Sequence, residues 1–118
     1  MLKTIQFLGR VTYLNDIDKI KEFTISKKIQ FTNHAILRLS ERKINILQDI
    51  VPAILSSEII EEYPKDYPYK SFLLLGKTHS EKPLHIVCAL SNDVLWIITG
   101  YFPNNIKWND DFKTRKER

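Results

Sequence analysis

Side chains that could transfer protons and bind phosphate lie close together in the segment FTNHAILRLSERKI, residues 31–44. His34, Arg38 and Arg42 recur every four residues, so on a helix they share an arc of about 100° with Glu41. An imidazole exchanges a proton near neutral pH, and two guanidinium groups one turn apart can bind a phosphate together. The alternative is a solvated helix face on which Arg38 pairs with Glu41.

A second group of polar residues interrupts two apolar segments that have the composition of strands. His85 lies within PLHIVCAL, and Thr99 and Tyr101 lie within WIITGYF. The strand period of two predicts that Thr99 and Tyr101 share a face with Leu95 and Ile97. Because an unpartnered polar group is costly to bury, these residues are either hydrogen-bonded core residues or parts of a site. Their occurrence beside a helix with histidine and arginine favours a site.

The pairing of the two strands decides whether these residues meet. A two-residue turn at Asn92 and Asp93 would place His85 opposite Gly100, whereas a loop of odd length would place it opposite Thr99 or Tyr101. Asn-Asp without a following glycine is a weak signal for a two-residue hairpin turn. We therefore predict the odd loop.

Three helices are predicted in the first half of the chain, each preceded by a residue that favours the N-cap position. The second is predicted over residues 33–43. The third contains Pro52, which deprives the carbonyl of Gln48 of its helical partner and predicts a kink or a short first turn there. The predicted N-caps are Asp16, Thr32 and Asn45.

The hydrophobic period changes from helical to strand-like near residue 58, and the strands that follow are joined by short links. This order predicts an α+β fold with N-terminal helices packed on a three- to four-stranded antiparallel sheet. Polar and apolar residues alternate within residues 1–15, and this pattern predicts an N-terminal arm or strand. Residues 112–118 form a basic tail, which we expect to be solvated, although Trp108 and Phe112 could fasten this end to the body.

Length and composition limit the class of protein. The 118 residues, of which 43% are hydrophobic, predict a single domain, 1–118. No apolar run approaches the roughly 18 residues that span a membrane, and the single cysteine excludes an internal disulfide. We expect a cytoplasmic protein without membrane contact. The net charge of +4 is compatible with binding nucleic acid but does not establish it.

No metal ion or cofactor is predicted. His85 and Cys88 are three residues apart, so on a strand they point to opposite faces and cannot share a metal ion. The same geometry excludes nucleophilic catalysis by a Cys–His pair. His79 lies in a predicted link between strands, where we expect it to be exposed to solvent.

Four segments together resemble a known family. They are FTNHAILRLSERKI, EIIEEYP with YPYKSFLLLGKT, KPLHIVCAL, and WIITGYFP followed by KW. In order and spacing they are similar to the bacterial domain-of-unknown-function family 4258 over residues 29–110. That family is grouped with RelE- and BrnT-like toxins of the barnase–EndoU–colicin–RelE folds, most of which cleave RNA. Lys43 departs from the pattern, since glycine is often found there.

The resemblance implies a metal-independent ribonuclease of a toxin–antitoxin system, with RNA as substrate and an antitoxin as partner. Such cleavage needs a base for the 2′-hydroxyl, an acid for the 5′-oxygen and cations for the developing charge. The alternative is a noncatalytic module that binds protein or RNA and whose polar cluster is structural. The oligomeric state stays open. The expected catalytic residues are His34, His85, Arg38 and Tyr101, and the expected substrate-binding residues are Arg42, Thr99 and Glu41.

Overall fold

The computed structural model describes residues 4–7 and 10–117, and for the first two strands it describes the backbone only. These strands, β1 (Thr4–Phe7) and β2 (Arg10–Tyr13), form an antiparallel ladder of their own. Both lie in the segment predicted as an N-terminal arm or strand, of which residues 1–3 and 8–9 are outside the described residues.

The remaining strands form one five-stranded mixed sheet in the order β3-β7-β6-β5-β4. From β4 to β7 neighbouring strands are antiparallel, and β3 runs parallel to β7. In chain order the elements after β2 are α1 (Asp16–Ile25), β3 (Ile29–Phe31), α2 (Asn33–Glu41), the π-helix η1 (Ile46–Ile50), α3 (Val51–Leu55), β4 (Glu58–Tyr63), β5 (Ser71–Lys77), β6 (Pro83–Leu90) and β7 (Leu95–Tyr101).

The predicted α+β class is confirmed, and the predicted sheet is wrong in one respect. It has five strands rather than three to four, and the additional strand β3 is parallel to its neighbour. With three residues, β3 is too short to display the alternation that identifies a strand in a sequence. Its partner, residues 95–97 of β7, is also far away in the chain.

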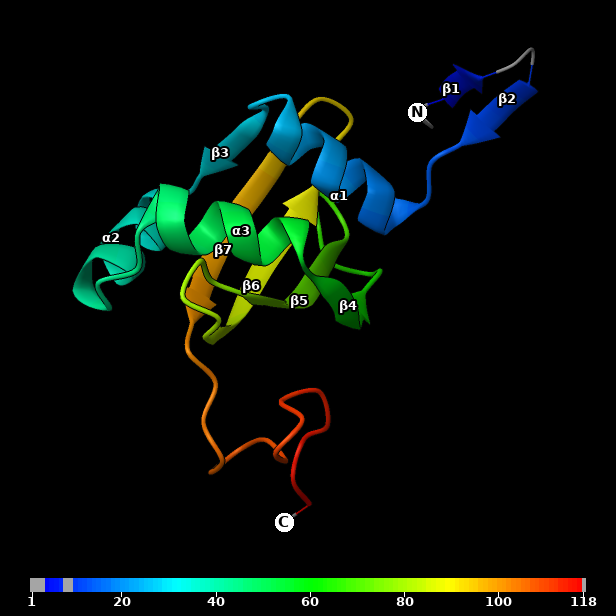
Figure 1. Cartoon of the computed structure of the whole chain (residues 1–118). Helices are drawn as coiled ribbons and strands as arrows, with labels where there is room; N and C mark the ends of the chain where they lie inside the picture. Colours follow the sequence, from blue (N-terminus) through cyan, green and yellow to red (C-terminus); the bar gives the residue numbers. More distant parts are fainter. Residues whose placement is uncertain (1–3, 8–9, 118) are drawn as a thin grey trace.

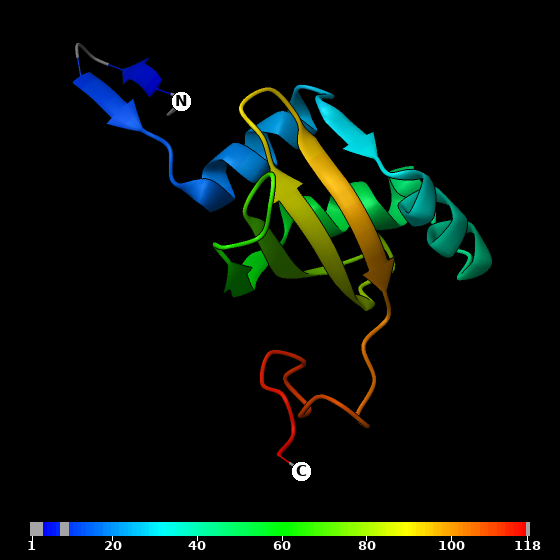
Figure 2. The same cartoon turned by 180° about the vertical axis from the view of Figure 1, so that it is seen from behind.

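The helices α1 and α3 cover one face of the sheet (Figure 1), and the opposite face is seen without a covering helix (Figure 2). Alternate residues of β5, β6 and β7 point toward the helices and form the core with α1, η1 and α3. Gly76 shows how closely the layers pack, because a Cβ at this position would lie 1.8 Å from the carbonyl oxygen of Ala53 in α3.

Two of the three predicted N-cap residues are confirmed, and one is wrong. Thr32 and Asn45 cap α2 and η1 as predicted, through hydrogen bonds from Ala35 and from the first turn of η1. The first helix is capped by Asn15 rather than by Asp16, which is its first residue. The second ends at Glu41, earlier than the predicted residue 43, because Lys43 adopts a left-handed conformation with φ 57° that ends a helix.

Next to Pro52 the helical segment changes from the π-helix η1 to the α-helix α3, which begins at Val51. Pro52 has no backbone N–H to donate to the carbonyl of Gln48. This carbonyl instead accepts a 2.8 Å hydrogen bond from the backbone N–H of His79. The loop between β5 and β6 therefore supplies the hydrogen-bond donor that the carbonyl of Gln48 lacks within the helix.

His85 pairs with Tyr101 across the β6–β7 ladder, one of the two partners that we predicted. The predicted loop of odd length, however, is wrong. Leu90 pairs with Leu95, and the chain reverses through the two-residue turn at 92–93 instead of an odd loop. The odd offset comes from a bulge farther along the ladder.

The bulge lies at Ile98, which has no partner on β6 although Ile97 and Thr99 both have one. An extra residue in one strand turns over the part of the strand that follows it. The prediction that Thr99 and Tyr101 share the face of Leu95 and Ile97 is therefore wrong. The glycine between Thr99 and Tyr101 faces the core, so these two side chains belong to the face without helices.

Candidate functional site

The side chain of His85 is completely buried, with 0% of its surface exposed. Its Nδ1 lies 3.2 Å from the hydroxyl oxygen of Tyr101, and its Nε2 lies 2.7 Å from the carbonyl oxygen of Phe112. Because a carbonyl oxygen only accepts, Nε2 carries the hydrogen atom, and Nδ1 of the neutral ring accepts from the Tyr101 hydroxyl. The ring of Trp108 packs edge-to-face at 4.5 Å between centroids.

The surroundings keep this pair uncharged. Burial lowers the pKa of His85 below its ordinary value of 6.5 and outweighs the hydrogen bond to Phe112 and the nearby Glu61 carboxylate, which raise it. Burial also raises the pKa of Tyr101. Near neutral pH the imidazole is therefore neutral and the phenol protonated, and each ring nitrogen has a partner.

The C-terminal hairpin, residues 107–116, supplies much of this burial. Trp108 and Arg115 form an isolated antiparallel bridge, and the N–H of Lys116 donates a 2.9 Å bond to the carbonyl of Lys107. The segment follows β7 beyond the end of the sheet (Figure 2). Trp108, which is 2% exposed, holds it to the body, as the sequence suggested.

The hairpin is fastened to β4 by charge. The guanidinium of Arg115 donates two hydrogen bonds to Glu61, of 2.7 and 2.9 Å, and lies 4.6 Å from the centre of the Trp108 ring. The bond from Arg115 lowers the pKa of Glu61 below its ordinary value. Lys113 forms a further 3.0 Å ion pair with Glu58. Lys113 and Arg115 are therefore ion-paired, while their side chains stay 46% and 56% exposed to solvent.

The charged residues of α2 divide into two groups. Arg38 pairs with Glu41 at 2.8 Å on the surface, which is the intrahelical alternative for these two residues. Arg42 instead reaches β7, where it donates to the carbonyl of Gly100 at 2.7 Å and to Thr99 Oγ1 at 3.1 Å. The strand β3 pairs only with residues 95–97, so Arg42 occupies the edge of β7 that β3 leaves free.

His34 lies exposed in the first turn of α2. Within the part of the chain that the structure describes, its imidazole makes no hydrogen bond or ion pair. The two histidines of the predicted site therefore have different surroundings. His34 lies on the surface, whereas His85 is buried and has two hydrogen-bonding partners.

A cleft of about 320 Å³, which we call the cationic cleft, opens where β7 runs into the C-terminal hairpin. Its lining brings together Arg42 and Tyr101 of the predicted site, and it does not include His34, Arg38 or Glu41. Three cationic side chains and a phenol facing one cavity suit an anion such as a phosphate. The residues that line the cleft are Arg42, Tyr101, Phe102, Pro103, Asn104, Lys107, Trp108 and Arg115.

Two of these cations, Lys107 and Arg115, were missed by the sequence analysis, as was the carboxylate of Glu61. The sequence does contain a signal for them, since the acidic segment EIIEEY and the basic end KTRKER have opposite charges. Asp111 supplies a second signal, because its side chain accepts from the N–H groups of residues 113 and 114 and shapes the turn of the hairpin. The sequence alone does not say which acid meets which base.

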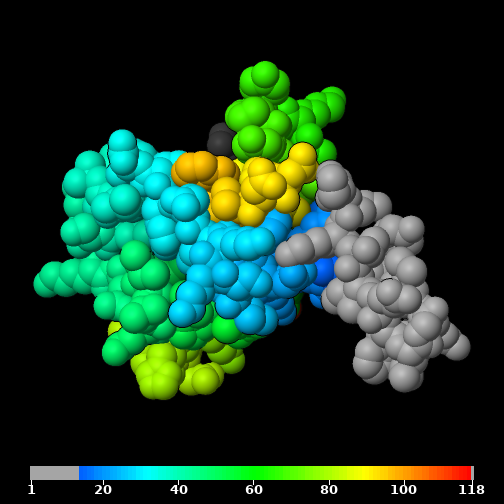
Figure 3. Space-filling model, turned by 90° about the horizontal axis from the view of Figure 1, so that it is seen from above, coloured from blue at the N-terminus to red at the C-terminus, as the bar shows by residue number. Residues whose placement is uncertain are grey.

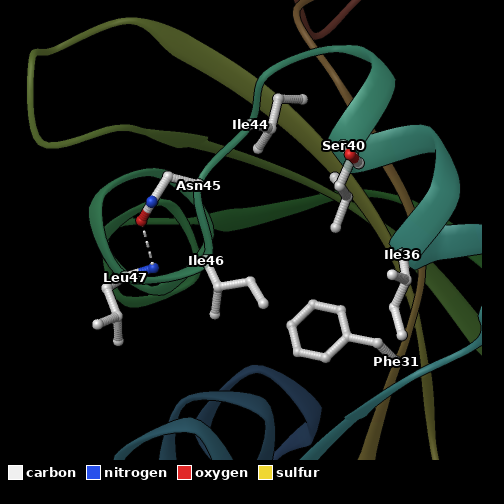
Figure 4. Close-up of a pocket in the computed structure, with 8 residues that line it drawn as sticks. Phe31, Ile36, Ser40, Ile44, Asn45, Ile46 and Leu47 are labelled. Atoms are coloured by element: carbon white, nitrogen blue, oxygen red, sulfur yellow. Dashed lines mark hydrogen bonds between the residues drawn. The ribbon is translucent and has the colours of Figure 1, made fainter.

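A second hollow, the apolar groove, lies between α2 and η1 (Figure 4). Phe31, Ile36 and Ile46 point into it, and the hydrogen bond from the N–H of Leu47 to Asn45 Oδ1, 2.9 Å long, shapes its far wall. The lining has no titratable side chain, so acid–base chemistry has no basis there.

Among residues 4–7 and 10–117, no three His, Cys, Asp or Glu side chains are grouped so that they could hold a metal ion. The buried Cys88 has a pKa raised by burial to about 12, which makes it a poor nucleophile. None of the helices in the described part of the chain has the length and apolar character that crossing a bilayer requires.

The fold and the site define a small α+β protein with helices on one face of a mixed sheet and a cationic cleft at the end of its last strand. Residues 31–102 match the model of the family described as a domain of unknown function (DUF4258), and the chain belongs to this family. No curated protein matches the chain, and no solved structure does.

Proposed function

We propose that the protein is a metal-independent endoribonuclease of the RelE- and BrnT-like toxins. The observation that carries this proposal is Tyr101, which lines the cationic cleft and whose hydroxyl lies 3.2 Å from Nδ1 of a buried neutral His85. A phenol backed by a base, beside three cations, has the groups that phosphodiester cleavage needs without a metal ion.

In the proposed reaction the scissile phosphate lies against Arg42, Lys107 and Arg115, which offset the charge of the phosphorane. Tyr101 takes the proton of the 2′-hydroxyl as its own passes to Nδ1 of His85. The 2′-oxygen then forms a bond to phosphorus, and the bond from phosphorus to the 5′-oxygen breaks. The ammonium group of Lys107 gives the 5′-oxygen its proton, so the products are a 2′,3′-cyclic phosphate and a 5′-hydroxyl.

His85 can receive this proton although burial lowers its pKa. Its Nε2–H donates to the carbonyl of Phe112, and the Glu61 carboxylate is near, and both interactions favour the imidazolium that the transfer creates. Its neutral resting state leaves Nδ1 available as the acceptor.

The test is cleavage of labelled single-stranded RNA by the full chain in the presence of EDTA, with analysis of the product ends. Tyr101→Phe, which keeps the ring and removes the hydroxyl, is expected to lower the rate by about 10² to 10⁴-fold. Leu47→Ala, at an exposed residue of the apolar groove, is expected to cleave at the normal rate. Activity that requires added metal, or full activity of Tyr101→Phe, would rule out this mechanism.

The proposal includes an antitoxin partner, in keeping with the resemblance to toxins. The apolar groove offers a surface for a protein, since Ile36 and Leu47 at its rim are 54% and 77% exposed. Expression of the chain alone in a bacterium should arrest growth, and Tyr101→Phe should restore it. Normal growth at full expression of the unaltered chain would contradict a toxin.

The second candidate function is a noncatalytic module that binds RNA or protein. The complete burial of His85, with both nitrogens already bonded, favours this alternative, since such histidines often serve the core. RNA binding that is unaffected by Tyr101→Phe, without cleavage by either protein, would support it over the nuclease.

A further inference from the structure

A cleft lined by aromatic side chains lies on the sheet face that carries no helix. It has a volume of about 510 Å³, and Tyr67, Tyr69 and Trp96 line it. Tyr67 is 94% exposed and Tyr69 42% exposed, so both rings present apolar surface to solvent. We call it the aromatic cleft. The loop between β4 and β5 that carries the two tyrosines stands out from the sheet on the side away from α1 (Figure 3).

The aromatic cleft and the cationic cleft belong to the same face. Trp96 pairs with Ala89 in the ladder, and Tyr101 pairs with His85. Ala89 and His85 are separated by four residues on β6, so their side chains point to the same side. Four residues of a strand span about 13 Å, which is about four nucleotides at the rise of about 3.4 Å per nucleotide in a helical strand and fewer in an extended one.

Polar side chains in the lining of the aromatic cleft could hydrogen-bond to a base that stacks there. The carboxylate of Asp66 accepts a hydrogen bond from the hydroxyl of Ser71, and both residues line the aromatic cleft. A carboxylate has capacity for further donors, and the N–H groups on the edge of a base are donors of this kind. A phosphate would be repelled by Asp66, so the ring of a base fits this position better than the RNA backbone does.

We propose that the aromatic cleft binds an unpaired base of the RNA, a few nucleotides from the phosphate held in the cationic cleft. This inference rests on the proposed function, because it assigns the substrate of that site as single-stranded RNA. Rings of tyrosine and tryptophan stack on bases in many proteins that bind single strands. A duplex would bury its bases and could not supply one.

Binding of a labelled single-stranded RNA to the full chain tests the proposal separately from cleavage. The RNA carries 2′-O-methyl groups throughout, which prevents cleavage, and a second RNA of the same length lacks its bases. Fluorescence anisotropy is expected to show tighter binding of the RNA with bases by about fivefold to a hundredfold. Tyr67→Ala and Tyr69→Ala should bind the two RNAs with similar affinity. Tyr67→Phe and Leu47→Ala should still bind the RNA with bases more tightly. Lys107→Ala should weaken the binding of both RNAs equally.

Each failure has its own signature. If Lys107→Ala weakens binding but the tyrosine variants bind as tightly as the unaltered chain, no base occupies the aromatic cleft and the inference is wrong. A protein segment would then be the better occupant. If binding depends on the bases and on Tyr67 but unmodified RNA is never cleaved, the nuclease proposal fails and the base site stands. If neither RNA binds, both proposals fail.

Discussion

Arg115 and Glu61 form a forked ion pair, Nε to Oε2 at 2.7 Å and Nη2 to Oε1 at 2.9 Å, which joins the C-terminal hairpin to β4. The same guanidinium lies over the ring of Trp108, and Trp108 packs against His85. The acceptor of the His85 Nε2–H is a carbonyl of this hairpin, that of Phe112. The ion pair on the surface therefore helps to hold the histidine behind the cationic cleft in place.

Arg115→Ala should loosen the hairpin. The two side chains of its ion pair are 56% and 22% exposed, and pairs of this kind contribute about 0.2–1 kcal/mol. We expect the free energy of unfolding to fall by about 1 kcal/mol, because the geometry is forked and Glu61 loses its partner. Urea denaturation measures this change, and limited proteolysis should cut the C-terminal hairpin faster.

Lys113→Ala is the matched control, since its pair with Glu58 is 46% and 55% exposed. It should change the stability and the proteolysis less than Arg115→Ala does. Equal effects of the two substitutions would show that the forked pair has no special part in holding the hairpin.

Stability should decrease as the solution becomes acidic. Burial lowers the pKa of folded His85 below 6.5, so the unfolded chain takes up a proton first. The contribution of this histidine is complete above pH 6.5 and is lost as the pH falls through the pKa of the folded state. Glu61 acts in the same direction lower down, because its folded pKa is lowered from 4.5.

The measurement is the urea midpoint at a series of pH values from neutral to acid. The first decrease is expected just below pH 6.5, and His85→Gln, which has no titrating ring, should lack it. A midpoint that is constant down to the range of the carboxylates would contradict a neutral buried His85.

Arg42→Ala and Arg38→Ala should differ in their effect on RNA binding. Arg42 lines the cationic cleft, whereas Arg38 lies outside it and pairs with Glu41. Loss of one cation at a phosphate should weaken binding at low salt and reduce the dependence on salt by about one charge. Titrations at several salt concentrations distinguish the two variants. An equal loss for Arg38→Ala would extend the site along α2, as the sequence alone suggested.

Gly76→Ala should be strongly destabilising. The new Cβ would lie 1.8 Å from the carbonyl oxygen of Ala53, a backbone atom that cannot move alone. We expect a loss of about 3 kcal/mol or more, or failure to fold. Gly100→Ala is the control, because its Cβ would meet the flexible end of Leu39 at 3.0 Å and should cost about 1 kcal/mol. Thermal unfolding compares them, and similar melting temperatures would contradict the close packing of α3 on β5.

The parts of the fold that depend on neighbouring residues could be predicted from the sequence. The caps at Thr32 and Asn45 arise within one turn of chain. The parallel pairing of β3 could not be predicted, because it joins segments distant in sequence and leaves no periodic signal in three residues.

The site was predicted in part for the same reason. The pairing of His85 with Tyr101 was expected on the basis of a loop length, but a bulge at Ile98 produces it, and nothing in the residue types marks that position. The contact of His85 with the carbonyl of Phe112 involves a backbone atom, which any residue could provide. Arg42 differs from Arg38 by its contact with the edge of β7, a tertiary contact that the residue types do not mark.

The hydrogen bond from Arg42 to Gly100 also covers part of a free sheet edge. A sheet with open edges offers unpaired backbone groups to which another chain can add a strand, the first step toward fibrils. Beyond the end of β3, the edge of β7 would expose such a carbonyl, and the guanidinium occupies it. A side chain of the proposed phosphate site thus also occupies a carbonyl to which another chain could add a strand.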